Sequence, residues 1–158
     1  MSALAESPSS GVFDGLEHVL PVRVYYEDTD FTGVVYHANY LRFFERGRTE
    51  YLRAAGVDHR ALLERADPCA FTVTRLSIEF RRAARVDDAL AVRTLYTRFR
   101  GVRVEVRQRL VRGEELLAEA DVEVVCITPD GRPRRPPPDM LERLRPRLAE
   151  APPAPGAP

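Results

Sequence analysis

Four strand-like runs between residues 70 and 128 constrain the fold more than any other feature of this chain. They cover about residues 70–82, 89–100, 102–112 and 115–128. The stretches RFRGVRVEV and VRGEELL place Gly101 and Gly113 at or beside two of the turns, as antiparallel hairpins prefer. Few of the connections are long enough for crossovers, so the runs are predicted to form sequential antiparallel strands of one sheet.

A long amphipathic helix is predicted ahead of these strands, over about residues 38–55. Its apolar face carries residues spaced by three and four: Tyr40, Phe44, Gly47, Tyr51 and Ala55. Gly56 follows as the expected C-terminal cap. A glycine inside a helix costs about 1 kcal/mol relative to alanine, so we expect another backbone to approach closely at Gly47.

The remaining elements decide the fold class. A strand-like stretch precedes the long helix at residues 18–28, with Val22, Val24 and Tyr26 on one face. Two shorter helical pieces are predicted, at about residues 59–65 and 138–148. The order of strand, long helix and four antiparallel strands predicts an α+β fold, in which the long helix packs on one face of a strongly curved sheet.

The length and the two ends define the domain organisation. A chain of 158 residues fits one domain and is long enough to bury roughly 70% of the surface that its unfolded form exposes. We expect residues 1–17, which are rich in Ser, Pro, Gly and Ala, to be a disordered extension. Residues 18–150 are predicted to form the single domain, and residues 151–158 a disordered Pro-rich tail.

Charge and hydropathy give no indication of a nucleic acid or membrane partner. The 24 basic and 24 acidic residues balance, and no stretch approaches the ~20 apolar residues that span a bilayer. The N-terminus also lacks the basic start and apolar core of a signal peptide. We therefore expect a cytoplasmic protein, with Cys69 and Cys126 as reduced and buried small hydrophobes.

The segment YEDTDFTGVVYHANYLRFFERGR, residues 26–48, stands apart from the rest of the chain. Within it, Glu27, Asp28, Asp30 and His37 are four metal-ligand types in eleven residues, and the spacing imitates the opening of a calcium loop. The twelfth position, however, holds an asparagine instead of a bidentate glutamate, and a strand precedes the loop where a helix is required. The sequence therefore predicts no metal site and no cofactor.

Nucleophilic residues are few. Ser77 is the one serine in the predicted folded part, and no G-x-S-x-G elbow surrounds it, which excludes a serine hydrolase. A cysteine enzyme stays open, because Cys69 or Cys126 could approach His37 in space. Neither cysteine has an activating local motif.

A carboxylate near the start of the long helix is the most informative combination. A helix N-terminus presents unpaired N–H groups and partial positive charge, which stabilise an oxyanion as it develops. Gly33 allows the chain to reverse between Asp30 and that helix, so both could meet at one point and hydrolyse an activated acyl group. Asp30 would then act as a general base or as a nucleophile. The structural alternative is that Asp28, Asp30 and Asn39 only satisfy turn and cap amides.

Residues 26–48 closely resemble the signature of the 4-hydroxybenzoyl-CoA thioesterase family, and within it the YbgC-type acyl-CoA thioesterases associated with the Tol-Pal system. The run IEFRRAARVDDAL, residues 78–90, is also similar to a strand-and-turn segment of that family. The resemblance covers most of residues 20–135. It implies a hot-dog fold, with a curved antiparallel sheet wrapped around one long central helix. It also implies hydrolysis of an acyl-CoA thioester to a free acid and CoA, without metal or redox cofactor.

The resemblance assigns roles by position. Asp30 matches the catalytic carboxylate, and Asp28 matches a residue that supports the loop. His37 matches the position whose backbone N–H polarises the thioester carbonyl, and its imidazole is a second candidate group. Phe31 is a departure, since many relatives have a smaller residue there; it changes either the acyl pocket or only the packing of the loop.

Further candidates for substrate binding lie along the same motif and on the strands. Tyr36 and Asn39 occupy matching positions beside the site, although Asn39 fits a helix cap equally well. Glu45 matches an F-E-R segment and is either part of the site or a solvated helix charge. Three strand arginines are candidates for the CoA phosphates: Arg82, Arg98 and Arg100. Guanidinium groups pair bidentately with phosphate, and the alternative for each is an ordinary solvated arginine.

The resemblance also implies partners. A site shared between two subunits implies a homodimer or a homotetramer, with acyl-CoA as substrate and acyl carrier protein as an alternative carrier. A different class of function stays open, in which a hot-dog module binds acyl-CoA or acyl carrier protein without turnover. Asp30 argues against that alternative, because binding alone does not need this carboxylate. A dehydratase is a third possibility, but its usual pairing of a histidine with an acid on the facing helix is not evident.

Overall fold

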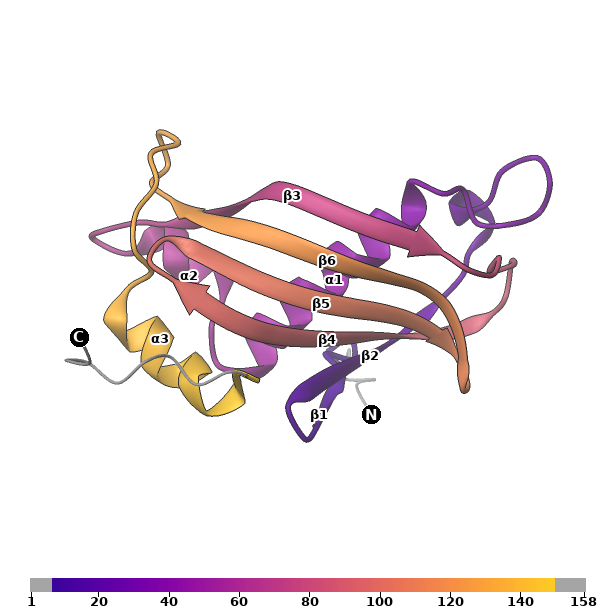
Figure 1. Ribbon diagram of the computed structural model, residues 1–158, viewed down its shortest axis with the longest axis horizontal. Coiled ribbons are helices and arrows are strands. Elements are labelled where there is room, and N and C mark those ends of the chain that lie inside the picture. Colours follow the sequence, from indigo (N-terminus) through magenta and orange to yellow (C-terminus); the bar gives the residue numbers. More distant parts are fainter. Residues whose placement is uncertain (1–6, 150–158) are drawn as a thin grey trace, which may run out of the picture.

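The computed structural model describes residues 7–149, in which one antiparallel sheet curves around a long helix (Figure 1). The strands are β1 (Val12–Asp14), β2 (Glu17–Arg23), β3 (Ala70–Phe80), β4 (Ala89–Arg100), β5 (Arg103–Arg112) and β6 (Glu115–Ile127). The helices are α1 (Asn39–Ala54), α2 (His59–Glu64) and α3 (Pro138–Leu144), with short 3-10 turns η1 (Tyr26–Asp28) and η2 (Arg145–Arg147). None of these helices is long and apolar enough to cross a membrane.

The strand order in the sheet is β1-β2-β4-β5-β6-β3. Strands β4, β5 and β6 are consecutive neighbours, as predicted, but β3 pairs with β6 instead of β4. The reason lies in residues 81–88, which cross the end of the sheet and are anchored there: Val35 N donates to Ala84 O at 2.8 Å, and Asp87 N donates to Val24 O at 2.9 Å. This curved sheet around a central helix confirms the predicted α+β class and hot-dog fold.

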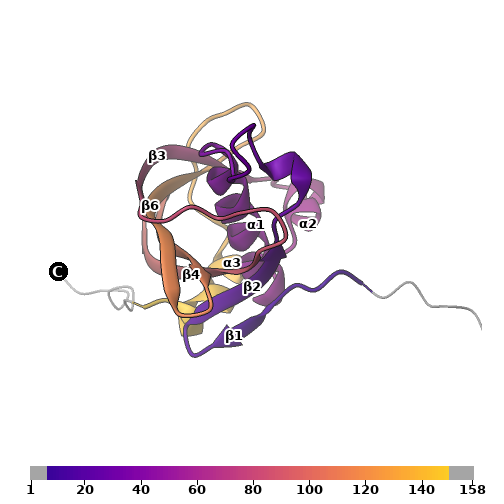
Figure 2. The same cartoon turned by 90° about the vertical axis from the view of Figure 1, so that its right-hand side faces the viewer.

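The core lies between α1 and the concave face of the sheet, which Figure 2 shows in cross-section. Strand β5 alternates buried and exposed residues, with Val104, Val106 and Leu110 facing inward. From the helix, Phe43 and Phe44 are fully buried against this face. Burial of each such side chain stabilises the fold by roughly 1.5–3 kcal/mol. The period-3.6 pattern of α1 and the period-2 pattern of the strands therefore meet in one apolar layer.

Gly47 is the point of closest approach between α1 and the sheet. A Cβ atom built on Gly47 would lie 2.5 Å from Val92 Cγ1, 2.8 Å from Thr94 Oγ1 and 3.0 Å from Gln108 Nε2. The expected close contact at this glycine is present, but it involves side chains of β4 and β5 and not a backbone. Gln108 is fully buried and donates to Phe44 O at 2.8 Å and to Thr94 Oγ1 at 2.9 Å. The absence of a Cβ atom at Gly47 thus leaves room for the buried polar side chains of Thr94 and Gln108.

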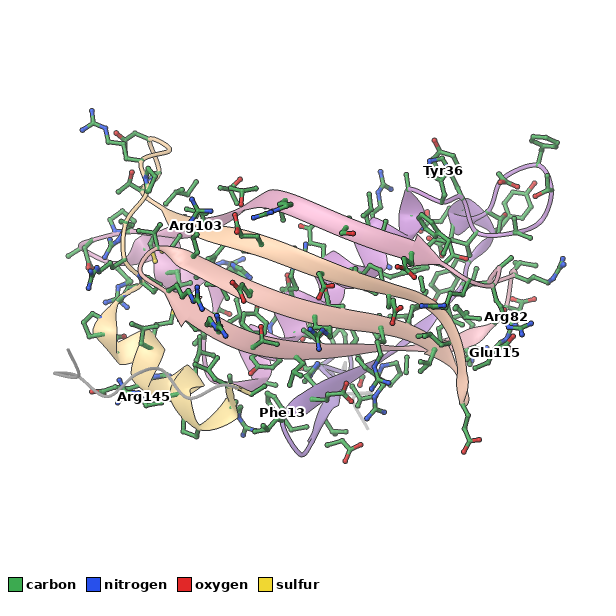
Figure 3. All side chains as sticks on the ribbon, in the orientation of Figure 1. Phe13, Tyr36, Arg82, Arg103, Glu115 and Arg145 are labelled. Carbon is green, nitrogen blue, oxygen red and sulfur yellow. The ribbon has the colours of Figure 1, made fainter. Side chains whose placement is uncertain are left out.

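The N-terminal expectation is wrong for residues 12–17. Strand β1 forms a hairpin with β2, pairing Val12 with Val19 and Asp14 with Glu17. Phe13 stabilises the hairpin, because its ring packs edge-on against Tyr51 with centroids 5.2 Å apart and lies 3.7 Å from the Arg147 guanidinium. Figure 3 shows Phe13 on β1, and Arg145 at the start of η2. Residues 1–6 and the tail 151–158, also expected to be disordered, lie outside the described residues.

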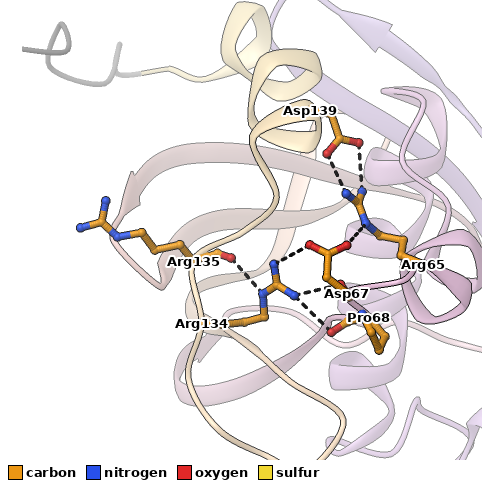
Figure 4. Close-up of polar contacts among 6 residues, drawn as sticks. All are labelled: Arg65, Asp67, Pro68, Arg134, Arg135 and Asp139. Carbon is orange, nitrogen blue, oxygen red and sulfur yellow. Dashed lines mark hydrogen bonds and ion pairs between the residues drawn. The ribbon is translucent and has the colours of Figure 1, made fainter.

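A polar network fixes the C-terminal segment to the rest of the domain (Figure 4). Arg65 donates to both carboxylate oxygens of Asp139 at 2.9 and 3.0 Å, and to Asp67 at 3.1 Å. Arg134 donates to the main-chain oxygen of Asp67 at 2.9 Å and to its carboxylate at 3.2 Å. Exposed ion pairs are each worth about 0–1 kcal/mol, so this network orients α3 more than it stabilises the fold.

Candidate active site

The loop ahead of α1 is closed by main-chain bonds. Thr29 and Val35 form an isolated β-bridge, Asp30 N donates to Val34 O at 2.9 Å, and Gly33 N donates to Asp30 O at 3.0 Å. Gly33 has φ +80°, a conformation that glycine adopts without strain. The predicted reversal at Gly33 is therefore confirmed, and Asp30 lies at the start of a tight turn.

The strand that leads into the loop is shorter than predicted. It ends at Arg23, and η1 then turns the chain. Tyr26, predicted to lie on the same strand face as Val24, lies outside the strand and is 86% exposed, whereas Val24 is fully buried, so that prediction is wrong. Side chains alternate between two faces only within a strand, so this alternation does not place Tyr26 after the strand has ended.

Asp28 supports the loop from inside, as the resemblance implies. It is only 4% exposed, and its Oδ2 accepts a hydrogen bond from Tyr25 N at 2.8 Å. Its Oδ1 accepts a short hydrogen bond from Asn39 Nδ2, and its main-chain oxygen accepts one from Tyr36 N at 2.9 Å. These bonds connect the loop to the first turn of α1.

Asn39 is placed differently from either expectation. It is 7% exposed and its side chain faces Asp28, so it lies beneath the site and not along an open surface that substrate would touch. The N-cap position of α1 is Ala38, and no side chain caps this end of the helix. Asn39 positions the loop by holding Asp28.

Asp30 has one occupied and one free carboxylate oxygen. Its Oδ1 accepts hydrogen bonds from Thr32 N, at 2.8 Å, and from the Thr32 hydroxyl. The structural alternative, in which the Asp30 carboxylate satisfies an amide of the turn, is therefore correct for Oδ1. Oδ2 has no hydrogen-bond partner among residues 7–149. The bonds from Thr32, followed by the charge of His37, lower the pKa of Asp30. The carboxylate is thus ionised at neutral pH and open to solvent.

Two backbone amides at the start of α1 are also free. The N–H groups of His37 and Ala38 have no acceptor among the described residues, whereas Asn39 N donates to Tyr36 O at 2.8 Å and Tyr40 N to His37 O at 3.4 Å. They lie at the positive end of a 16-residue helix. Free amides in this position stabilise negative charge on a carbonyl oxygen.

An aromatic wall flanks these amides. The His37 ring lies 4.6 Å from the Tyr36 ring and 6.4 Å from the Phe80 ring, centroid to centroid, and Tyr40 contacts Phe80 at 5.3 Å. His37, Tyr40 and Phe80 border an open hollow of about 270 Å³, together with Arg82. Sequence reasoning missed Tyr40 and Phe80, because they are 40 positions apart and only the fold places β3 beside the helix start.

Tyr36 and Arg82 lie at the same end of the molecule as the Asp30 loop (Figure 3). Tyr36 is 49% exposed, and Arg82 forms a solvent-exposed ion pair with Glu115 at 3.3 Å. Arg82 borders the hollow and is accessible to a ligand in it, whereas Tyr36 is exposed to solvent outside its lining. Phe31, the position that departs from many relatives, follows Asp30 directly in the chain. Its side chain is fully exposed.

Three other candidates do not border the hollow beside His37. Glu45 borders a separate cavity between α1 and the sheet. Arg98 and Arg100 lie at the end of β4, and Arg100 is paired with Arg103, which Figure 3 shows at the opposite end from Arg82. Their roles in substrate binding stay predictions.

The cysteine alternative loses its support. Cys69 and Cys126 are free and fully buried, as predicted. Burial and the neighbouring Cys69 raise the pKa of the Cys126 thiol to about 12, so it is not a thiolate at neutral pH. Residues 7–149 also contain no cluster of three or more His, Cys, Asp or Glu side chains that could hold a metal ion.

Comparisons with known proteins show which family the chain belongs to. A family model described as the thioesterase-like superfamily matches residues 24–144. The chain is 50% identical to the acyl-CoA thioesterase YbgC of Haemophilus influenzae over 107 residues, which are 68% of this chain and 78% of that protein. It is 49% identical to the acyl-CoA thioester hydrolase YbgC of Escherichia coli O6:H1 over 110 residues, 69% and 81% of the two chains. A crystal structure described as a probable thioesterase from Bartonella henselae has a TM-score of 0.75 and 42% identity, covering 77% of this chain and 99% of that one.

Proposed function

The chain belongs to the thioesterase-like superfamily as a YbgC-type thioester hydrolase, and on that premise we propose that it hydrolyses acyl-CoA to a free acid and CoA with Asp30 as the catalytic carboxylate. One observation supports this assignment above the others. The free, ionised Oδ2 of Asp30 and the free amides of His37 and Ala38 belong to the same short loop at the mouth of α1. A base or nucleophile and an oxyanion site are the two parts that acyl transfer requires.

The proposed mechanism uses these groups directly. The thioester carbonyl oxygen accepts hydrogen bonds from the amides of His37 and Ala38, which stabilise the negative charge that develops on it. Asp30 either takes a proton from the attacking water or attacks the carbonyl carbon itself to form an anhydride, which water then hydrolyses. In both routes the C–S bond breaks, CoA leaves as the thiolate and takes up a proton, and the acid is released.

We also propose that two copies assemble through β3. This strand is the last in the sheet, so one of its edges is unpaired within the described chain, and its Val73 and Phe80 side chains are 45% and 49% exposed. Such an edge is a template for another strand. If two β3 strands pair antiparallel about a two-fold axis, the Phe80 end of one lies beside the Ala70 end of the other. Sedimentation analysis of Val73→Lys tests this, since a charge on the edge should favour the monomer.

A homotetramer, acyl carrier protein as carrier and a cytoplasmic location stay predictions. The first is tested by the same sedimentation measurement on the wild type. The second is tested by comparing acyl-CoA with the matching acyl carrier protein as substrate, and the third by cell fractionation.

Thiol release tests the activity itself. Wild-type protein is mixed with short, long and aromatic acyl-CoAs and a thiol-reactive dye, and saturable release from at least one of them is expected. Tight binding of acyl-CoA without any release would favour the non-catalytic binding module. Label found in Asp30 after turnover in ¹⁸O-labelled water would establish the anhydride route, because a general base gains no oxygen from water.

A further inference from the structure

A second cavity, of about 260 Å³, lies between α1, α2 and the concave face of the sheet. It is distinct from the hollow beside His37, since no residue borders both. Most of its wall is apolar and comes from Leu52, Phe71, Val73 and Tyr96. The polar residues of the wall are Glu45, Arg48, Thr49, His59 and Thr72, and Arg48 is the one arginine among them.

The guanidinium of Arg48 is held in a fixed position. Its Nη1 donates to Gln108 Oε1 at 2.9 Å. Gln108 cannot turn, because its amide nitrogen already donates to Phe44 O and to Thr94 Oγ1. An arginine held in this way is part of a built site and differs from the solvated arginines on the outer face of the sheet.

Arg48 forms no ion pair within residues 7–149, although the Glu45 carboxylate borders the same cavity. Its one side-chain acceptor there is the neutral Gln108. Desolvation lowers the pKa of Arg48, although Glu45 opposes the effect from the exposed rim of the cavity. Arginine carries five N–H donors and is costly to bury without an anion. The remaining donors of Arg48 are therefore available to a ligand in the cavity.

We propose that this cavity binds a carboxylate on a short apolar body, with Arg48 as the counter-charge. Charge-assisted hydrogen bonds from guanidinium to carboxylate are among the strongest in proteins, and the apolar wall suits the rest of the molecule. A volume of about 260 Å³ leaves room for a small carboxylate such as benzoate or hexanoate.

Such a ligand has two sources. One is the free acid that the enzyme releases. The other is the far end of an acyl group that carries its own carboxylate, held at Asp30 of a second copy. That source rests on the proposed function, because antiparallel pairing of β3 brings the Phe80 end of one copy beside Phe71 and Val73 of the other.

Equilibrium binding tests the cavity without any turnover. Calorimetry is performed with benzoate and with the neutral benzyl alcohol on wild type, Arg48→Met and Arg42→Met, where Arg42 is an exposed residue of the same helix. We expect wild type and Arg42→Met to bind benzoate at least about tenfold more tightly than the alcohol, and Arg48→Met to lose this preference. Equal binding of benzoate by Arg48→Met and wild type, or none by the wild type, would overturn the proposal.

Two further variants test the role of charge in the cavity, and thermal melting tests for a folding defect. Arg48→Lys keeps the charge and should retain part of the preference, and thermal melting of each variant verifies the fold. Glu45→Gln removes a competing carboxylate from the rim and should tighten benzoate binding. Weaker binding in Glu45→Gln would show that the anion does not lie near Arg48.

Thiol release from adipoyl-CoA and hexanoyl-CoA separates the two sources. If the ligand is the far end of the acyl group, wild type has the higher kcat/KM for adipoyl-CoA by about tenfold, and Arg48→Met reduces the ratio to about one. If the ligand is the free acid, the ratio is about one in both proteins, and benzoate inhibition of the wild type is lost in Arg48→Met. Absence of thiol release from both thioesters would count against the proposed function, while the calorimetry still decides on the cavity.

Discussion

Replacement of Gly47 by alanine is the sharpest test of how α1 packs on the sheet. In an open helix this change is stabilising by about 1 kcal/mol. Here the new methyl would lie 2.5 Å from Val92 Cγ1 and 3.0 Å from Gln108 Nε2, both fully buried. Overpacking costs about 1–3 kcal/mol, and a displaced Gln108 leaves a buried donor unpaired at a further cost of about 1–3 kcal/mol. We expect a net loss of about 3 kcal/mol in the free energy of unfolding.

Urea unfolding of the purified variant measures this loss, and the melting temperature should fall by about 6–12 °C. A companion substitution, Val92→Ala, removes the nearest atom. The two changes together should cost at least about 1 kcal/mol less than the sum of the single changes, because they share one contact. If Gly47→Ala is as stable as the wild type, the close packing described here is wrong.

Three further predictions concern the loop and the cysteines. Because the pKa of Asp30 lies below its ordinary value of 3.8, kcat/KM should stay constant as the pH is lowered toward 4 and should fall only below it; a fall near pH 6 would contradict Asp30 as the essential group. Asn39→Ala leaves the buried Asp28 carboxylate without one donor, so urea unfolding should show a loss of about 1–3 kcal/mol; an unchanged value would mean that the bond contributes nothing. Cys126 should react slowly with a thiol reagent at pH 8 in the native protein and rapidly after unfolding, because burial raises its thiol pKa to about 12.

The sequence was sufficient for the elements whose periodicity is local. The face of α1 and the strands after residue 70 follow from apolar spacing alone, and the structure has α1 at Asn39–Ala54 and β4 at Ala89–Arg100, close to the predicted bounds. The hairpin at β1 was missed because its composition is that of a loop. Its order comes from Phe13, which packs against Tyr51 and Arg147. These two residues lie 38 and 134 positions later in the chain.

Long-range contacts set the parts of the site that the sequence did not reveal. The pairing of β3 with β6 depends on the path of residues 81–88, which no local pattern encodes. The role of Asn39 depends on Asp28, 11 residues earlier, and that of Arg48 depends on Gln108, 60 residues later. By contrast, Asp30 and Gly33 form a turn by local chemistry, and the sequence identified both.

The most direct test of the central claim is thiol release by Asp30→Asn beside the wild type, on the acyl-CoA that the wild type hydrolyses fastest. Asp87→Asn is the matched control, since Asp87 is exposed and the change in charge is the same. We expect kcat/KM to fall at least about a hundredfold in Asp30→Asn, about 2.7 kcal/mol of transition-state stabilisation, and to stay at the wild-type value in Asp87→Asn. A fall of less than about tenfold in Asp30→Asn, with the fold intact, would show that another group carries the reaction.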